Sequence, residues 1–216
     1  MKRILILLVS LFICSAGNAQ DCYRAIYKSV NTVDINNYKF PEGLSQDQKM
    51  NLIKEMKKVN YVVSYNYGNI VTINPQTSGP EESDFNLPVT LIDVHDSTIY
   101  QYFHGDSAYI IGARNKMNFV QDSTNIVYNG MRINSAFLKS ADIRIWYKPE
   151  SPYLMPMYSG NIYGTIYKYC YGNSFCFELQ KIQKYDNCEI PDLTKFTKLT
   201  KEEWKEVKLR RMPRHR

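Results

Sequence analysis

Residues 167–179 read YKYCYGNSFCFEL, two runs of aromatic and β-favouring residues on either side of the turn sequence GNS. Such runs are typical of strands, and a short loop containing glycine between them predicts an antiparallel hairpin. If GNS is a three-residue loop, Tyr171 pairs with Phe175. Cys170 and Cys176 then become opposite neighbours with their side chains on one face of the hairpin.

The same alternation of strand-like runs and turns continues along the chain. NYVVSYNYGNIVTIN predicts a hairpin that turns at Gly68-Asn69, and STIYQYFHGDSAYIIG predicts another that turns at His104-Gly105-Asp106. The 18 tyrosines could form a surface for a carbohydrate or peptide, but tyrosine is also a normal residue of half-buried sheets. The sequence predicts a mainly β (α+β) fold, in which antiparallel strands form a curved sheet or incomplete barrel with two helices.

The first expected helix spans residues 45–59. Ser45 and Gln48 have the spacing of a capping box. Apolar residues then recur at helical spacing, which predicts a stripe that packs on the sheet, with both methionines as core fillers. The stripe residues are Leu52, Ile53, Met56 and Val59, and the two methionines are Met50 and Met56.

The second expected helix covers residues 201–210. Thr200 and Glu203 form a second capping box, and Leu199 can pack against Trp204 as a hydrophobic staple.

A surface loop is expected over residues 74–88. This stretch combines proline, glycine and acidic residues, which do not suit a sheet.

Residues 1–19 have the pattern of a signal peptide. Two basic residues precede an apolar run over 4–13, and small residues lead to a cleavage site after Ala19. The run is too short to cross a bilayer, and Cys14 follows Ile13 rather than the small residue that lipidation signals require. We therefore expect a mature chain beginning at Gln20 and located outside the cytoplasm: periplasmic, associated with the outer membrane, or secreted. Residues 20–194 would form the β-rich domain and 195–216 a terminal helix with a basic tail.

The mature chain holds four cysteines, an even number that favours disulfides in an oxidising compartment. Neither a zinc site nor a redox centre is indicated, because the C-x-x-C spacing of both is missing. The hairpin register pairs Cys170 with Cys176 and leaves Cys22 to pair with Cys188. The alternatives are the two pairings that join Cys22 to Cys170 or to Cys176, and one bridge with two free thiols.

Residues 93–106 hold the acidic and histidine residues that most resemble a metal site. If residues 98–103 form a strand, His95 and His104 lie at its two ends, roughly 30 Å apart at about 3.3 Å per residue. We therefore interpret Asp93, Asp96 and Asp106 with these histidines as turn residues. No metal or other cofactor is predicted.

Charge is distributed unevenly along the chain. Residues 195–216 contain nine Lys and Arg against three Glu, a net charge of +6, whereas residues 21–194 carry 16 basic and 18 acidic residues, a net of −2. The basic end could be a solvated terminus, or it could contact an anionic membrane surface or an acidic partner. No nucleic acid partner is expected. The tail residues concerned are Lys208, Arg210, Arg211, Arg214 and Arg216.

The later part of the chain resembles the GLPGLI family of secreted bacterial proteins. The resemblance covers roughly residues 125–206 and implies export and a strand-rich fold, with no activity to transfer. The motif that names the family is absent, and NIYGTIYK stands in its place. The matching positions are Ile126, Tyr128, Trp146, Tyr147, Pro152, Gly164, Pro191 and Thr200.

The function expected from these observations is a non-enzymatic binding or assembly module of the bacterial envelope. It would hold a partner or small apolar ligand on the concave face of its sheet. The alternative is an extracytoplasmic hydrolase, although the sequence has no G-x-S-x-G elbow and no phosphate-binding glycine loop. A cleft with two or more convergent titratable side chains would favour the enzyme, and an aromatic groove without them would favour binding.

Overall fold

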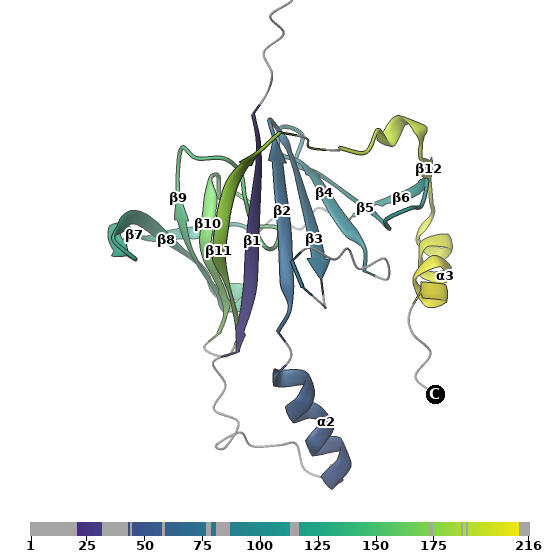
Figure 1. Cartoon of the computed structure of the whole chain (residues 1–216), viewed down its shortest axis with the longest axis horizontal. Helices are drawn as coiled ribbons and strands as arrows, with labels where there is room; N and C mark the ends of the chain where they lie inside the picture. Colours follow the sequence, from purple (N-terminus) through teal and green to yellow (C-terminus); the bar gives the residue numbers. More distant parts are fainter. Residues whose placement is uncertain are drawn as a thin grey trace, which may run out of the picture.

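One open, curved sheet dominates the computed structural model of the chain (Figure 1). The structure describes residues 21–31, 43, 45–57, 59–76, 79–80, 87–112, 117–172, 175–186, 188 and 190–211. The strands are β1 (Cys22–Asn31), β2 (Tyr61–Tyr67), β3 (Ile70–Gln76), β4 (Val89–Asp93), β5 (Thr98–Tyr102), β6 (Ala108–Ile111), β7 (Val120–Tyr128), β8 (Met131–Leu138), β9 (Ile143–Lys148), β10 (Thr165–Tyr171), β11 (Phe175–Tyr185) and β12 (Thr197–Lys198). The helices are α2 (Gln46–Lys57) and α3 (Lys201–Arg211), with short 3-10 turns η1 (Lys139–Ala141) and η2 (Leu193–Lys195).

The sheet consists of two meanders that meet at β1. Strands β2 to β6 follow one another on one side of β1, and β7 to β11 return from the far edge to pair with its other side. The chain then crosses the sheet, and β12 pairs with β6 at the opposite edge. The mainly β, antiparallel prediction is confirmed, although the short β12–β6 pairing is parallel.

The hairpin registers follow from the turn sequences. β2 and β3 turn at Gly68-Asn69, and β5 and β6 turn between Tyr102 and Ala108, as predicted. In the β10–β11 hairpin, Tyr171 lies opposite Phe175 and Cys170 opposite Cys176, which confirms the predicted register. The two cysteines are disulfide-bonded with their Cα atoms 4.1 Å apart.

The main hydrophobic core lies on one face of the sheet. Tyr27 of β1, Ile145 of β9 and Tyr169 of β10 are almost fully buried there. Residues 149–164, which connect β9 to β10, cover this face and bury Leu154 and Met155. Each buried aliphatic side chain, such as those of Ile145 and Leu154, contributes about 1.5–3 kcal/mol by leaving water.

Deep burial of tyrosine predicts a loss of stability in alkali. Burial raises the pKa of Tyr102 to about 12 and also raises the pKa of Tyr27 and Tyr169. The folded state binds these protons more tightly than the unfolded state, in which tyrosine has a pKa of about 10. The contribution of these tyrosines to the free energy of unfolding is therefore fully present below about pH 10. It falls as the pH rises from about 10 through about 12.

Urea unfolding of the chain from residue 20 onward at increasing pH measures this effect. Tyr102→Phe should lose less stability between about pH 9 and pH 11 than the unmodified chain. Tyr163→Phe is the control, because Tyr163 is 51% exposed. Equal losses in all three proteins would contradict the assignment.

Helix α2 forms as expected but does not pack on the sheet. Its capping box is confirmed. The backbone N–H of Gln48 donates to Ser45 Oγ (3.2 Å), and the backbone N–H of Ser45 donates to Gln48 Oε1 (2.9 Å). The helix lies beyond the end of the sheet rather than against a face (Figure 1). The prediction that Met50 fills the core is wrong, since its side chain is 51% exposed, and Val59 is 41% exposed. The side chains of Leu52 and Met56 lie outside the described part.

The first three residues of the expected surface loop over 74–88 belong to β3, and residues 77, 78 and 81–86 of that loop lie outside the described part. β3 continues to Gln76 and includes Pro75, which lies opposite Val62 of β2. Asn74 and Gln76 are buried, at 7% and 6% exposed. Proline fits here because β3 pairs with β4 only as far as Ile73 on its other side.

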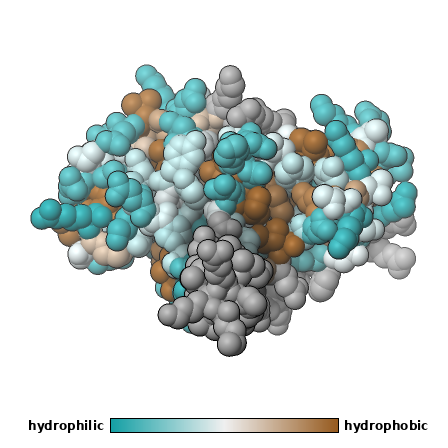
Figure 2. Space-filling model, turned by 90° about the horizontal axis from the view of Figure 1, so that it is seen from above, coloured by the Kyte–Doolittle hydropathy of each residue, from teal (hydrophilic) through white to brown (hydrophobic). Residues whose placement is uncertain are grey.

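The free edge at β7 is irregular. Its pairing with β8 shifts register between Gln121 and Ser123 and again between Ser123 and Ile126, and such bulges hinder edge-to-edge association. Val120 and Val127 on this strand are 71% and 75% exposed. In the view from above, several hydrophobic patches lie among hydrophilic residues (Figure 2).

Candidate ligand-binding groove

A groove of about 900 Å³ lies on the face of the sheet opposite the main core. β2, β3 and β5 contribute its floor, and the turn after β5 (residues 103–107) forms one rim. The crossing segment, described at residues 188 and 190–196, forms a wall. We call it the tyrosine groove. The residues that define it for the argument are Tyr65, Tyr67, Thr72, Asn74, Tyr102, His104, Asp106, Tyr185 and Phe196.

Strand alternation and register place the tyrosines on this face. Tyr65 and Tyr67 are two residues apart on β2, so their side chains share a face. Tyr65 lies opposite Thr72 of β3, and Tyr185 of β11 lies opposite Cys22. The Tyr65 and Tyr185 rings meet edge to face, with centroids 5.8 Å apart across β1. The alternation that the sequence shows is therefore the source of the aromatic lining.

A second aromatic cluster lies at the other end of the groove. The Tyr102 ring of β5 meets Phe196 at 5.9 Å and His104 at 6.4 Å, both edge to face. Phe196 arrives from the crossing segment, which also covers a small apolar cluster containing Val89 and Leu91 of β4. The packing of Phe196 on the sheet therefore holds the wall of the groove in place.

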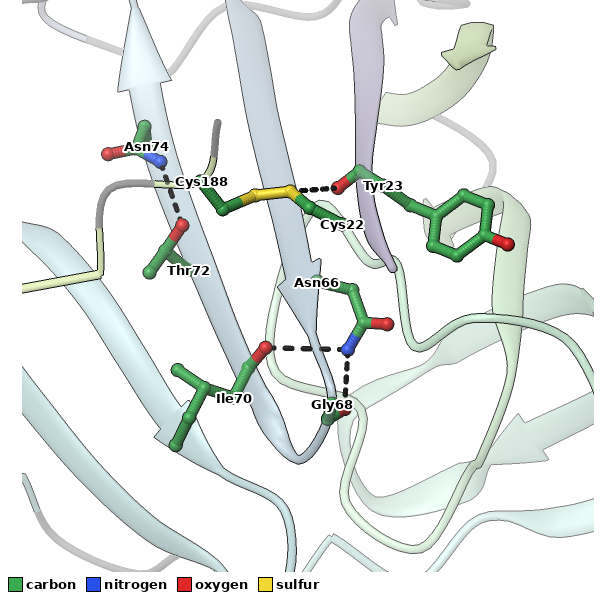
Figure 3. Close-up of a disulfide and its surroundings, with 8 residues drawn as sticks. All are labelled: Cys22, Tyr23, Asn66, Gly68, Ile70, Thr72, Asn74 and Cys188. Carbon is green, nitrogen blue, oxygen red and sulfur yellow. Dashed lines mark hydrogen bonds between the residues drawn. A yellow bond between two sulfur atoms is a disulfide. The ribbon is translucent and has the colours of Figure 1, made fainter. Parts of the chain in front are cut away.

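The polar part of the floor lies on β3. Asn74 Nδ2 donates to the Val63 carbonyl oxygen (3.2 Å) and to Thr72 Oγ1 (3.3 Å). Figure 3 shows the Asn74–Thr72 hydrogen bond close to the disulfide between Cys22 and Cys188. The groove thus has neutral hydrogen-bonding groups between its two aromatic ends.

The Cys22–Cys188 disulfide ties the crossing segment to the sheet at the start of β1 (Figure 3). The two Cα atoms are 6.0 Å apart, within the usual range for a disulfide. Both cysteine pairs are those the sequence predicted. Cys188 lines the groove, so this disulfide holds the wall of the groove as well as joining the two ends of the described domain.

Helix α3 holds the rim from outside. Its Thr200–Glu203 capping box is confirmed: the Thr200 amide donates to Glu203 Oε2 (2.7 Å) and the Glu203 amide donates to Thr200 Oγ1 (3.3 Å). These hydrogen bonds from the Thr200 backbone and side chain lower the pKa of Glu203. Trp204 is buried against Phe103, which directly follows β5, with ring centroids 5.0 Å apart, so the helix is docked on the domain.

A solvated terminus would leave the tail charges in water, but Arg211 is held against the domain. This residue belongs to α3, its guanidinium forms an ion pair with Asp106, and its Cζ lies 5.0 Å from the centre of the Phe103 ring. The sequence could not reveal this pair, because 105 residues separate its members.

The other tail residues have partners or lie outside the described part. Arg210 forms an exposed ion pair with Glu206 at 3.4 Å, and Lys208 Nζ lies 5.7 Å from the centre of the Trp204 ring. Arg214 and Arg216 lie outside the described residues, as do Cys14 and the expected signal peptide. Contact of the tail with an anionic surface stays a prediction.

The histidines of the acidic segment are far apart, as the strand geometry predicted. His95 precedes β5 and forms an ion pair with Asp96 at 2.8 Å, which raises the pKa of His95. His104 follows β5 and lines the groove, where burial lowers its pKa. Across the described ranges, no three His, Cys, Asp or Glu side chains come together as metal ligands would. None of the helices described is long and apolar enough to span a bilayer.

The groove offers no matched acid and base on opposite sides. Apart from tyrosines, the titratable side chains among its described lining residues are His104 and Asp106, which belong to one turn. Asp106 is held by Arg211. The sequence analysis interpreted these two as turn residues, and it identified none of Tyr65, Tyr102 and Tyr185 as a site residue. Their convergence depends on the order of the strands.

Comparison with known proteins finds a likeness of fold alone. No protein-family model and no curated protein matches the chain. Two crystal structures of PNGF-II, in space groups C2 and P21, superpose with TM-scores of 0.60 and 0.59 at 14% and 16% sequence identity. Each covers 88% of this chain, but the chain spans only 33% and 34% of the PNGF-II chains.

Proposed function

We propose that this chain is an exported, non-enzymatic binding module of the bacterial envelope that holds its ligand in the tyrosine groove. The observation that carries the proposal is the groove's lining: rings from β2, β5, β11 and the crossing segment converge on a polar floor. Large concave sites lined by aromatic side chains, with a few placed polar groups, are the usual form of small-ligand sites.

Export is supported by the two disulfides, which are typical of proteins outside the cytoplasm. The groove is also well fixed for a binding site. Its wall is joined covalently to β1 through Cys188, and its rim is held by Trp204 and Arg211 of α3. A preformed site loses less conformational entropy when the ligand binds.

The hydrolase alternative receives less support. General acid–base catalysis needs groups of suitable pKa placed on either side of the reacting bond. His104 and Asp106 lie two residues apart in one turn, and Arg211 keeps the Asp106 carboxylate ion-paired. Binding therefore accounts for the groove better than catalysis does.

Mass spectrometry of small molecules that copurify with the mature protein from its native envelope tests the proposal. Tyr67 and Tyr185 are 38% and 39% exposed, so Tyr67→Ala/Tyr185→Ala should remove groove surface without unfolding the protein. We expect a compound enriched by the unmodified protein and by the control Tyr163→Ala, but at least about tenfold less by the groove variant. Equal enrichment by all three would contradict the proposal, and chemical conversion of the compound would support the hydrolase instead.

A further inference from the structure

The two aromatic clusters of the tyrosine groove are spaced for a ligand with more than one ring. Tyr65 on β2 and Tyr102 on β5 are separated by β3 and β4, which places the strands about 14 Å apart at about 4.8 Å per strand. Thr72 and Asn74 lie on β3 between them. A ligand that contacts both clusters therefore passes over neutral polar groups.

These polar groups keep hydrogen-bonding capacity for a ligand. Asn74 uses its amide nitrogen in both of its side-chain hydrogen bonds, which leaves its carbonyl oxygen as an acceptor. Thr72 Oγ1 accepts from Asn74, which leaves the hydroxyl proton to donate. The hydroxyls of Tyr67, Tyr102 and Tyr185 make no hydrogen bond within the described part of the chain. Donors and acceptors alternate with rings around the groove.

The groove holds no uncompensated charge among its described lining residues. Asp106 is paired with Arg211, and burial lowers the pKa of His104, which favours its neutral form near neutral pH. A ligand carboxylate, phosphate or ammonium entering the groove would lose water without gaining an oppositely charged partner, which is unfavourable. The lining therefore selects an uncharged ligand.

Extended peptides fit this groove poorly. Peptides that bind to sheets usually add a strand at an exposed edge, where main-chain hydrogen bonds supply the affinity. β2, β3, β4 and β5 each have a neighbouring strand on both sides. A peptide backbone over this floor would find side chains only.

We propose that the tyrosine groove binds a short neutral oligosaccharide, with one sugar ring against Tyr65 and Tyr185 and another against Phe196, whose ring packs on the buried Tyr102. A pyranose ring has apolar C–H faces that pack on aromatic rings, and its hydroxyls both donate and accept hydrogen bonds. Tyr67, Thr72 and Asn74 meet those hydroxyls. This inference rests on the proposed function, whose groove it uses, and adds the chemical class of the ligand.

The test applies the mature protein to an array that carries neutral oligosaccharides, oligosaccharides containing uronic acids, and acetylated, amidated peptides. We expect binding to neutral oligosaccharides, with little effect of salt because no ion pair is made. Tyr185→Ala should weaken this binding about tenfold, whereas Tyr185→Phe, which keeps the ring, should weaken it only about twofold. Tyr163→Ala is the matched control and should bind unchanged.

The outcomes separate this inference from the proposed function. Absence of binding to every neutral oligosaccharide overturns the inference, as does binding that Tyr185→Ala leaves unchanged in a folded protein. If the array is negative but the Tyr67→Ala/Tyr185→Ala variant loses a copurifying compound that is not a sugar, the groove keeps its binding function and only the ligand class is wrong. If the array is negative and no compound distinguishes that variant, both fail.

Discussion

Replacing Cys22 and Cys188 together by serine should lower the free energy of unfolding by about 5 kcal/mol. The disulfide joins residues 166 positions apart, and in the chain-entropy model the cost of its loss grows with the logarithm of the loop length. For a domain whose total stability is about 5–15 kcal/mol, this loss brings the protein close to unfolding at physiological temperature. Urea unfolding of the chain from residue 20 onward, followed by tryptophan fluorescence, measures the change.

The second disulfide supplies the matched comparison. Cys170 and Cys176 are six positions apart in their own hairpin, so the same model gives about 2 kcal/mol for the Cys170→Ser/Cys176→Ser variant. The hairpin also keeps its register through the pairing of Tyr171 with Phe175. A loss as large for the hairpin pair as for Cys22 and Cys188 would contradict the entropic account.

Loss of the long-range bridge should also affect the groove. Cys188 belongs to the wall, and Ile190 and Phe196 follow it along the crossing segment. Without the bridge, this segment remains attached through the packing of Ile190, Leu193 and Phe196 on the apolar cluster, and through β12 and α3. Under conditions in which the variant is folded, ligand affinity should fall as well, because the wall would have to be ordered on binding.

The Gly164→Ala variant should lose about 3–4 kcal/mol of stability. Gly164 precedes β10 with φ = +124°, a conformation that residues with a Cβ rarely adopt. A Cβ at this position would lie 2.1 Å from the Lys148 carbonyl oxygen, which belongs to the backbone of β9 and cannot rotate away. Backbone strain and steric overlap therefore act together.

Gly130→Ala separates the two effects. Gly130 lies in the β7–β8 turn with φ = +79°, and a Cβ there would meet no atom within 4 Å. Only the backbone strain remains, about 1 kcal/mol. Urea midpoints of both variants test the difference, and a Gly164→Ala variant no less stable than Gly130→Ala would show that β9 and β10 separate easily at this point.

The sequence alone determined the local elements because their signals lie within a few residues. Alternating apolar and polar residues defined the strands, glycine-containing turns set three hairpins, and the capping boxes at Ser45 and Thr200 began both helices. The hairpin register placed Cys170 opposite Cys176, and elimination then paired Cys22 with Cys188. Each of these inferences uses a short-range geometric rule.

Only the tertiary structure decided the contacts between distant segments. Apolar spacing in α2 predicted packing on the sheet, but residues 149–164 cover the main core face instead. Basic composition suggested that the C-terminal charges are free, yet Arg211 meets Asp106 because β12 brings α3 to the β6 edge. The tyrosine groove likewise depends on the strand order that joins β11 to β1 and carries residues 188–196 across the sheet. Packing of distant surfaces depends on the shape of the whole domain, and no single stretch of sequence carries that information.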